Sequence, residues 1–496
     1  MQLNAGELIA FILYFAIVIA IGVVFFFRTR GGGAADYFLG GRKMGSWVAA
    51  LSASASDMSA WLLMGLPGSI LAFGMGKVWI AIGLGIGTIL SWIFLAPRLR
   101  RFSIVAKDSI TIPQYLSNRF LSKSKALQII CAVVFLVCYA VYAASSFKAC
   151  GKLFHTVLQI DETVAMLIAA AVILAYTFLG GFSAVCWTDF FQGLLMIAAI
   201  VIAPIFALNA VVNGDMASAA SLGEHYFNLL PTGKLDWGSI SSILSGLGWG
   251  LGYFGMPHIL VRFMSIKTGD MVRKSRVIAS VWTVVALSAA VGVGLVGRFF
   301  SPELATNGEQ ESVFIEMVRG TFPGFIAGIL LSAILAASMS TADSQLLVSA
   351  SAFSSDVYQP VIRKDKASNK EILWVSRGIV ALIAIAALLI AVTPGSGSIM
   401  DLVENAWAGF ASAFGPVILL SVFWKRFTYR GACAGIITGA LADVLWLIFL
   451  SKPTGLYEII PGFLAGLCAA FVATLLDKEP EDNVKSLFQE AVSYKG

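Results

Sequence analysis

Residues Ser46–Trp61 read SWVAALSASASDMSAW and lie inside an apolar stretch of the chain. Asp57 comes about twelve residues into this stretch, or roughly 18 Å along a helix, which is near the middle of a bilayer core about 30 Å thick. A carboxylate there costs about 2.5–3.5 kcal/mol, and the serines around it compete for backbone hydrogen bonds. The pattern favours a broken helix whose freed carbonyls bind a cation. The alternative is a small-residue packing face with one satisfied aspartate.

The composition places the chain in a membrane. Of its 496 residues, 58% are hydrophobic and only 12% are charged, and the mean hydropathy is +0.86. A soluble domain carries about 25% charged residues, and soluble cores stop growing near about 250–300 residues. These values argue against a soluble enzyme, a nucleic-acid binder and a disordered protein. The scattered histidines and cysteines also make a disulfide framework or a His-based metal site improbable.

About thirteen apolar runs are long enough to cross a bilayer as helices, so we expect an all-α integral membrane protein without an extramembrane domain. The runs lie at roughly residues 6–27, 45–71, 76–97, 126–147, 162–180, 186–212, 238–263, 277–300, 323–353, 373–393, 400–424, 431–450 and 455–476.

The distribution of Lys and Arg predicts the orientation of these helices. If the N-terminus is outside, the loops and tail on the inner side carry 27 of the 34 basic residues and the outer segments carry 7. Because inner loops are enriched in basic residues, we expect a multi-pass protein of the cell membrane. Its N-terminus would be outside and its C-terminus cytoplasmic.

The seventh run contains GLGWGLGYFGMPH at Gly246–His258. Glycine and proline weaken helical hydrogen bonding, and non-helical backbone at this depth survives only beside protein or a water-filled cavity. We expect an unwound segment in which Trp249 and Tyr253 form an aromatic wall for a small substrate. The alternative is a kinked packing helix.

In the ninth run, the adjacent hydroxyls of Ser340 and Thr341 can offer oxygen to a hard cation, although such side chains often bond to their own helix instead.

The second and seventh runs are five runs apart and must therefore cross the membrane in opposite directions. Broken helices at matching places in two inverted halves point to a transporter site. We expect one repeat at 45–212 and a second at 213–424, which includes an external loop. Residues 1–44 would form the first helix and a cytoplasmic loop, 425–476 the last two helices, and 477–496 a cytoplasmic tail.

At these residues the sequence resembles the sodium:solute symporter family, over about residues 1–475. The matching motifs are DYFLGGR (36–42), SDMSAWLLMGLPG (56–68), GGFSAVCWTD (180–189), GWGLGYFG (248–255) followed by Pro257 and His258, and LSAILAA (331–337) followed by Ser340 and Thr341. The resemblance implies an inverted-repeat, LeuT-like core of five plus five helices.

The resemblance also implies the site residues. In the family a sodium ion lies between the second and ninth runs, with ligands at positions matching Ala55, Met58, Ala337, Ser340 and Thr341. Neutral oxygens of this kind suit a hard monovalent cation.

Two acidic positions belong to sodium coupling in the family. The Asp57 position is needed for coupling, and the Asp189 position is associated in some members with another sodium. A solvated carboxylate at the cytoplasmic rim is the alternative for Asp189. In the proline branch, substrate positions match Ser59, Tyr142, Trp249, Tyr253 and Pro257.

The implied function is secondary active transport: sodium-coupled uptake of L-proline by alternating access. Sodium would be the coupling ion, membrane lipid the surroundings, and no other cofactor or obligatory protein partner is evident. Met256 and Ala60 stand where proline carriers often have glutamine and glycine, so a sodium- or proton-coupled carrier of another small solute stays open. Asp343 is an extra acid that could face a cytoplasmic water cavity or tune ion binding.

Two other classes are less consistent with the sequence. An intramembrane enzyme would need a nucleophile–base or metal constellation, and the sequence offers none. A channel would show unsaturable downhill flux, which a transport assay detects.

Overall fold

The structure is a computed structural model that describes residues 4–29, 34–213 and 222–494. Within these ranges every regular element is a helix, apart from one isolated β-bridge between Met44 and Ile266. The predicted all-α class is therefore confirmed.

The described residues of the first half form nine α-helices: α1 (Ala5–Thr29), α2 (Ala34–Leu39), α3 (Ser46–Asp57), α4 (Leu66–Phe73), α5 (Val78–Leu90), α6 (Ala96–Val105), α7 (Ile112–Arg119), α8 (Ala126–Leu158) and α9 (Glu162–Asn213). The second half forms α10 (Trp237–Gly248), α11 (Pro257–Ser265), α12 (Gly269–Phe300), α13 (Val313–Thr321), α14 (Gly324–Phe353), α15 (Asn369–Val392), α16 (Ile399–Phe423), α17 (Tyr429–Phe449), α18 (Ser451–Thr454), α19 (Ile459–Leu476) and α20 (Asp482–Ser493).

Ten helices in the described parts of the chain are long and apolar enough to cross a membrane, which supports a multi-pass protein. The predicted runs 45–71 and 238–263 are each interrupted. The run 162–180 is the first part of α9, which is broken at Gly181 (φ 62°). The total of thirteen crossings and the side on which each terminus lies stay predictions.

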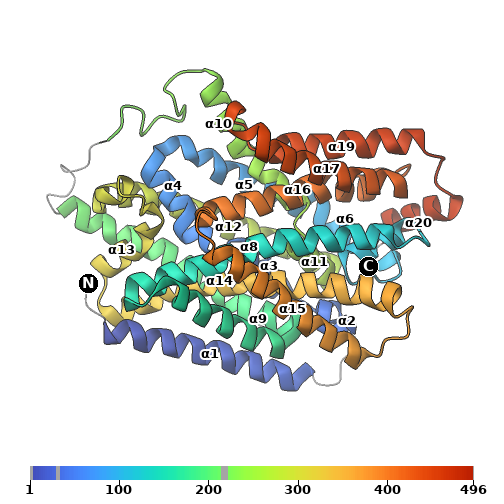
Figure 1. Cartoon of the computed structure of the whole chain (residues 1–496), viewed down its shortest axis with the longest axis horizontal. Helices are drawn as coiled ribbons and strands as arrows, with labels where there is room; N and C mark the ends of the chain where they lie inside the picture. Colours follow the sequence, from blue (N-terminus) through green and yellow to red (C-terminus); the bar gives the residue numbers. More distant parts are fainter. Residues whose placement is uncertain (1–3, 30–33, 214–221, 495–496) are drawn as a thin grey trace.

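The long helices lie roughly side by side along the long axis of the molecule (Figure 1). Helix α1 lies along one edge and packs against α9 and α14, and α17 and α19 pack against each other at the opposite edge. Helix α14 contacts α1, α3, α8, α9 and α15, and every residue from Leu330 to Ala352 is buried. A helix buried on all sides suits the small Ala and Ser side chains that fill α14, because they let neighbouring backbones approach closely.

Both predicted helix breaks are confirmed. Helix α3 ends at Asp57, Met58 leaves the helical conformation (φ −81°, ψ 72°), and a π-helical turn, η2 (Trp61–Gly65), leads into α4. In the other half, α10 passes into a 3₁₀ segment, η6 (Trp249–Phe254), and Met256 is extended before α11 begins.

The second break has a clear local cause. Pro257 occupies the first turn of α11, where its missing amide costs nothing, and it disfavours a helical conformation at Met256. Gly252 also lies so close to Trp407 that a Cβ atom would come within 2.0 Å of the indole. A side chain there would push η6 away from α16.

Candidate functional site

Helices α3 and α14 meet at a cluster of oxygen atoms. The Ser340 hydroxyl donates a hydrogen bond of 2.8 Å to the Ala55 carbonyl and lies 3.2 Å from the Ala337 carbonyl. Three of the five predicted sodium ligands therefore share one buried contact. Neutral carbonyl and hydroxyl oxygens are the ligands that hard cations prefer.

The other two predicted ligands border this cluster in sequence. Thr341 is fully buried, and its hydroxyl has no hydrogen-bond partner among the described residues. Met58 is also fully buried and is the residue at which the backbone leaves the α3 helix. A buried hydroxyl without a partner is costly, so Thr341 has oxygen available for a ligand.

Asp57 connects the two broken helices. Its carboxylate Oδ2 accepts a hydrogen bond of 2.6 Å from the Tyr253 hydroxyl in η6, while Oδ1 is buried without a partner among the described residues. Its backbone carbonyl accepts from the Tyr142 hydroxyl of α8 at 3.3 Å and from the Trp61 indole at 3.3 Å. The structure thus brings together three predicted residues from three different elements.

The remaining predicted substrate residues lie around this junction. Ser59 is buried in the first break, and its hydroxyl has no hydrogen-bond partner within the described chain. Trp249 is 2% exposed and borders the Trp61 ring, with 6.2 Å between ring centroids. Pro257 is buried at the start of α11, directly after Met256 in the chain, and Met256 is fully buried.

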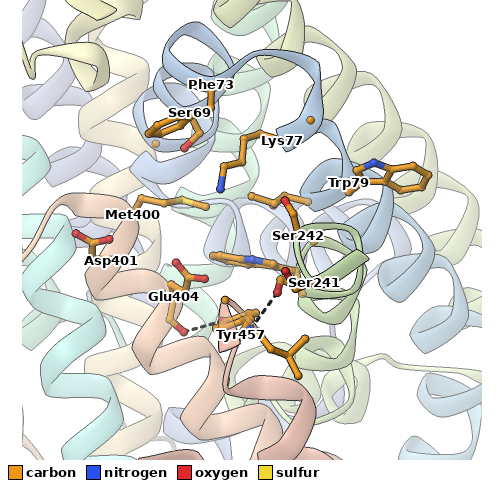
Figure 2. A pocket seen from close by; sticks show the side chains of 18 of the residues that line it. Ser69, Phe73, Lys77, Trp79, Ser241, Ser242, Met400, Asp401, Glu404 and Tyr457 are labelled. Atoms are coloured by element: carbon orange, nitrogen blue, oxygen red, sulfur yellow. Dashed lines mark hydrogen bonds between the residues drawn. The ribbon is translucent and has the colours of Figure 1, made fainter. Parts of the chain in front are cut away.

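Trp249 also lines a cavity of about 680 Å³ that opens between α4, α10 and α16. Figure 2 shows this cavity, with Lys77 and Phe73 on one wall and Glu404 and Tyr457 on the other. Of the predicted substrate residues in the described chain, Trp249 alone lines it. Trp249 therefore borders both this cavity and the Trp61 ring next to the first break.

Asp189 is not a solvated rim carboxylate; that alternative is wrong. Its Oδ2 forms an ion pair of 2.8 Å with Arg262 of α11, and the two side chains are 0% and 1% exposed. The Ser52 hydroxyl donates to the same oxygen at 2.7 Å and accepts from Arg262 Nε at 2.7 Å. Arg262 Nη2 also donates to Ser344 of α14 at 2.5 Å. This network joins α3, α9, α11 and α14.

The 27 basic residues counted on the inner side include Arg262, but its side chain is buried in the structure. Arg262 is a buried residue four positions after His258, and its Nη1 donates to the His258 carbonyl at 2.6 Å. The signal was present, because Arg262 lies inside the predicted run 238–263 and an arginine inside a span calls for a buried acidic partner.

Asp343 is also fully buried and accepts a hydrogen bond of 3.2 Å from the Ser344 hydroxyl. The possibility that it faces a cytoplasmic water cavity is therefore wrong.

Trp407 of α16 is a site residue that the sequence did not reveal. Its indole donates to the Trp249 carbonyl at 2.8 Å, and its ring stacks on Trp249 (centroids 6.3 Å apart) and meets Tyr253 edge-on (5.3 Å). Trp249 and Tyr253 are held on one side of η6 by this shared neighbour. Nothing in the apolar sequence around Trp407 distinguishes it from ordinary core residues.

Comparisons with known proteins identify the family of this chain. A model of the sodium:solute symporter family matches residues 37–439. The chain belongs to the sodium:solute symporter family. Members of this family are transporters, so the chain is a symporter and not an enzyme, as the sequence predicted.

Several characterised relatives resemble this symporter along their whole length. It is 43% identical to the sodium/proline symporter of Haemophilus influenzae, over 98% of this chain and 97% of that protein. It is 42% identical to the sodium/proline symporter of Escherichia coli, over 99% and 97%. It is 41% identical to the osmoregulated proline transporter OpuE of Bacillus subtilis, over 96% of each.

A solved structure shares the fold of this symporter. A Na⁺-coupled sialic acid symporter, in a substrate-bound outward-open state, superposes with a TM-score of 0.80 at 19% identity, over 97% of this chain and 100% of that one. The expected LeuT-like architecture is thereby confirmed.

Proposed function

We propose that this symporter takes up L-proline together with sodium by alternating access across the cell membrane, with its N-terminus outside and its C-terminus in the cytoplasm. The observation that carries the proposal is the contact of Asp57 with Tyr253, because it joins the two helix breaks at which a transporter of this architecture binds its ligands. The names of the relatives, which are sodium/proline symporters and a proline transporter, supply the solute and the ion.

The sodium ion would bind where the Ser340 hydroxyl now bonds to Ala55. The hydroxyl would turn its lone pairs toward the ion, and the two carbonyls that face Ser340 would become ligands together with Met58 and Thr341. An ion held by both α3 and α14 would fix these helices against each other. Asp57, two residues after Ala55, adds a negative charge to this region, which favours a cation.

The proline would bind beside the two breaks. Its ring would pack on Trp249 and Tyr253, and its carboxylate would face the N-terminus of the helix after the first break, because the positive end of a helix dipole favours an anion. The second break is less suited to this role, because the Tyr139 hydroxyl already accepts from the His258 amide at 3.0 Å and Pro257 has no amide hydrogen. Ser59, with its free hydroxyl, and Tyr142 would complete the pocket.

Binding of the two ligands is expected to be mutually favourable. Sodium would hold α3 in the position that completes the proline pocket, and linkage requires proline to increase sodium affinity by the same factor. The halves would then rock around the site. A potential that is negative inside adds about 2.3 kcal/mol per charge per 100 mV to the drive.

Asp189 would contribute to coupling through Arg262 and not as an exposed carboxylate. The ion pair joins α9 to α11, and Arg262 also bonds to Ser344 of α14. If α11 moves, either α9 and α14 move with it or these contacts break. A second sodium at Asp189 would bind at Oδ1, which has no hydrogen-bond partner among the described residues, while Oδ2 stays paired with Arg262.

The decisive experiment is reconstitution in liposomes with labelled proline. Accumulation that follows an inward sodium gradient, and that disappears when choline replaces sodium, is the expected result. Two results would contradict the proposal: proline accumulation driven equally well by a proton gradient, and accumulation of another solute in preference to proline. Either result would favour a sodium- or proton-coupled carrier of another small solute, the alternative that Met256 and Ala60 leave open.

A single substitution tests the cation assignment in the same assay. Asp57→Cys is expected to abolish sodium-stimulated uptake, whereas Asp161→Cys, at an exposed aspartate of the α8–α9 connection, is the matched control. Uptake by Asp57→Cys with an unchanged sodium dependence would refute the role of Asp57.

A further inference from the structure

The C-terminal helix α20 lies at the end of the molecule that also carries α2 and α6, opposite α13 (Figure 1). It packs on α6 and α7. One face of α20 is buried, and the side chains on this face are Val484, Leu487, Phe488 and Ala491. The Arg101 guanidinium of α6 also donates to the Val492 carbonyl of α20 at 3.1 Å. Helix α20 is therefore docked on α6 by the apolar face of an amphipathic helix and by a polar contact near its end.

Helix α6 carries contacts that close this end of the molecule. Arg100 donates to the carbonyls of Ile266 and Lys267, which directly follow α11, at 2.7 Å each. Arg98 donates to the Val422 carbonyl near the end of α16 at 2.9 Å. Because α11 is the helix that follows the second break, these bonds hold a part of the broken helix against α6.

Arg42 reaches the same place from another segment. It ends the 3₁₀ segment η1 (Gly40–Arg42) and donates to the Ser103 hydroxyl of α6 at 3.0 Å and to the Met264 carbonyl of α11 at 2.6 Å. It also forms an ion pair of 2.6 Å with Asp108. We call the contacts of α6 with η1, α11 and α16 the α6 closure. In a carrier that works by alternating access, a closure of this kind must open on the side where the solute leaves.

A permanent charge is buried beneath α20. Arg119 of α7 is fully buried, and its Nε donates to the Ser421 carbonyl at 3.0 Å. Its Nη1 and Nη2 have no hydrogen-bond partner among the described residues. The guanidinium lies 5.9, 5.6 and 5.0 Å from the ring centroids of Phe102, Phe120 and Phe488. Since Phe488 belongs to α20, the docked helix completes an aromatic enclosure around this charge.

Two effects of opposite sign therefore act on the docking of α20. Its apolar face is stabilised by leaving water, and the three rings attract the guanidinium. In contrast, a buried guanidinium with unpaired N–H groups is costly, because those groups have lost their water. Detachment of α20 would return water to Arg119. A docking contact that contains such an opposing effect opens more easily than a purely apolar contact of the same area.

We propose that α20 is a detachable strap that holds the α6 closure shut, and that the strap leaves Arg119 when this end of the symporter opens to release solute. The strap acts on α6 and α7 and not on the ligands, so its residues are positioning residues. The proposal rests on the proposed function, since it takes L-proline as the solute and places the C-terminus on the side of release.

Two substitutions in the enclosure should have opposite effects. Phe488→Ser removes the ring and leaves the charge, so α20 should detach more often. Arg119→Met removes the charge and keeps an unbranched apolar side chain, so α20 should detach less often, because apolar replacement of buried charges is often stabilising. A merely structural role predicts that both substitutions loosen α20. The matched control is Val492→Ser, which changes an apolar side chain of α20 that is 40% exposed.

Hydrogen exchange of the α20 amides in the purified full-length symporter measures detachment directly. At saturating sodium and proline, Phe488→Ser should speed this exchange about tenfold, as expected for the loss of a buried aromatic side chain. Arg119→Met should slow it, and Val492→Ser should match the wild type. Phe488→Leu, which keeps an apolar side chain and removes the aromatic face, should shift the exchange in the same direction as Phe488→Ser by a smaller amount, and it serves if the serine variant does not fold.

The second measurement is the rate at which labelled L-proline dissociates from the same proteins after dilution into sodium-free buffer. Dissociation should be faster in Phe488→Ser and slower in Arg119→Met than in the wild type. If Arg119→Met speeds exchange as Phe488→Ser does, the two residues only support the fold, and the strap is wrong. If exchange changes as expected but proline dissociates at the wild-type rate, α20 does not control the α6 closure, and the proposal is overturned while the proposed function stands. A wild type that binds no proline would overturn the proposed function, and the role of the strap in solute release with it.

Discussion

The Tyr253 hydroxyl donates a hydrogen bond of 2.6 Å to the Asp57 carboxylate, so that a residue of the second helix break neutralises part of a buried charge in the first. Both side chains are 2% exposed. A buried carboxylate that loses such a partner is left poorly solvated, and each break therefore depends on the other for its polar contacts.

Tyr253→Phe tests this dependence. Removing the hydroxyl while keeping the ring should raise the sodium concentration for half-maximal proline uptake about tenfold, because a hydrogen bond to a charged group is worth about 1.5–3 kcal/mol. Sodium titrations of uptake in liposomes measure this. Tyr115→Phe, which removes a buried hydroxyl that lies 2.9 Å from the Ser421 hydroxyl of α16, is the control. An equal effect of the two variants would contradict the specific role of Tyr253.

Ser340→Ala removes one predicted sodium ligand and the bond to Ala55. We expect a sodium requirement about tenfold higher, with proline affinity unchanged once sodium is saturating. The comparison is Ser349→Ala on the same helix, where a buried hydroxyl bonds only to the Gln345 carbonyl of its own helix at 2.8 Å. If Ser349→Ala shifts the sodium titration as far as Ser340→Ala does, the sodium assignment is wrong.

Trp249→Ala should weaken proline binding about tenfold or more and sodium binding much less, because it removes an aromatic surface and leaves the α3–α14 contact in place. Trp407 donates to the backbone carbonyl of Trp249, so that bond can persist in the variant. Separate titrations of sodium and proline on purified protein give the two affinities. Losses of equal size would indicate a general folding defect.

The Asp189–Arg262 pair makes a prediction about stability. Either single variant, Asp189→Asn or Arg262→Met, leaves one buried charge without its partner, which costs about 3–5 kcal/mol. The double variant should be more stable than Arg262→Met alone, because no charge is then left unpaired. Thermal unfolding in detergent checks this. A double variant that loses as much as the two single losses added together would show that the residues do not interact.

The sequence predicted the large features of this molecule because they follow from strong local signals. A buried acid among serines and a run of glycines before a proline mark the two breaks, and apolar length marks the membrane helices. These patterns also located Asp57, Trp249, Tyr253 and the hydroxyl pair at Ser340, and the family resemblance supplied Tyr142 and the expected ligand role of Ser340.

What the sequence did not reveal depends on contacts between distant segments. Trp407 lies in an ordinary apolar helix, and its role appears only where η6 and α16 pack together. Arg262 lies near the end of a predicted span, and the sequence alone does not show that Asp189 of α9 is its buried partner. Lys77 and Glu404 are far apart in the chain and face each other only across the folded cavity.

The hydrogen bond from Ser340 to Ala55 has a consequence for the release of sodium from the proposed site. If sodium binds at Ser340 as proposed, it must compete with the hydrogen bond that already joins the Ser340 hydroxyl to the Ala55 carbonyl. When the ion leaves, the hydrogen bond between the Ser340 hydroxyl and the Ala55 carbonyl forms again, so these two polar groups are not left unpaired. This hydrogen bond therefore lowers the free-energy cost of releasing sodium into a compartment with little sodium. It favours fast release of the ion over high affinity for it.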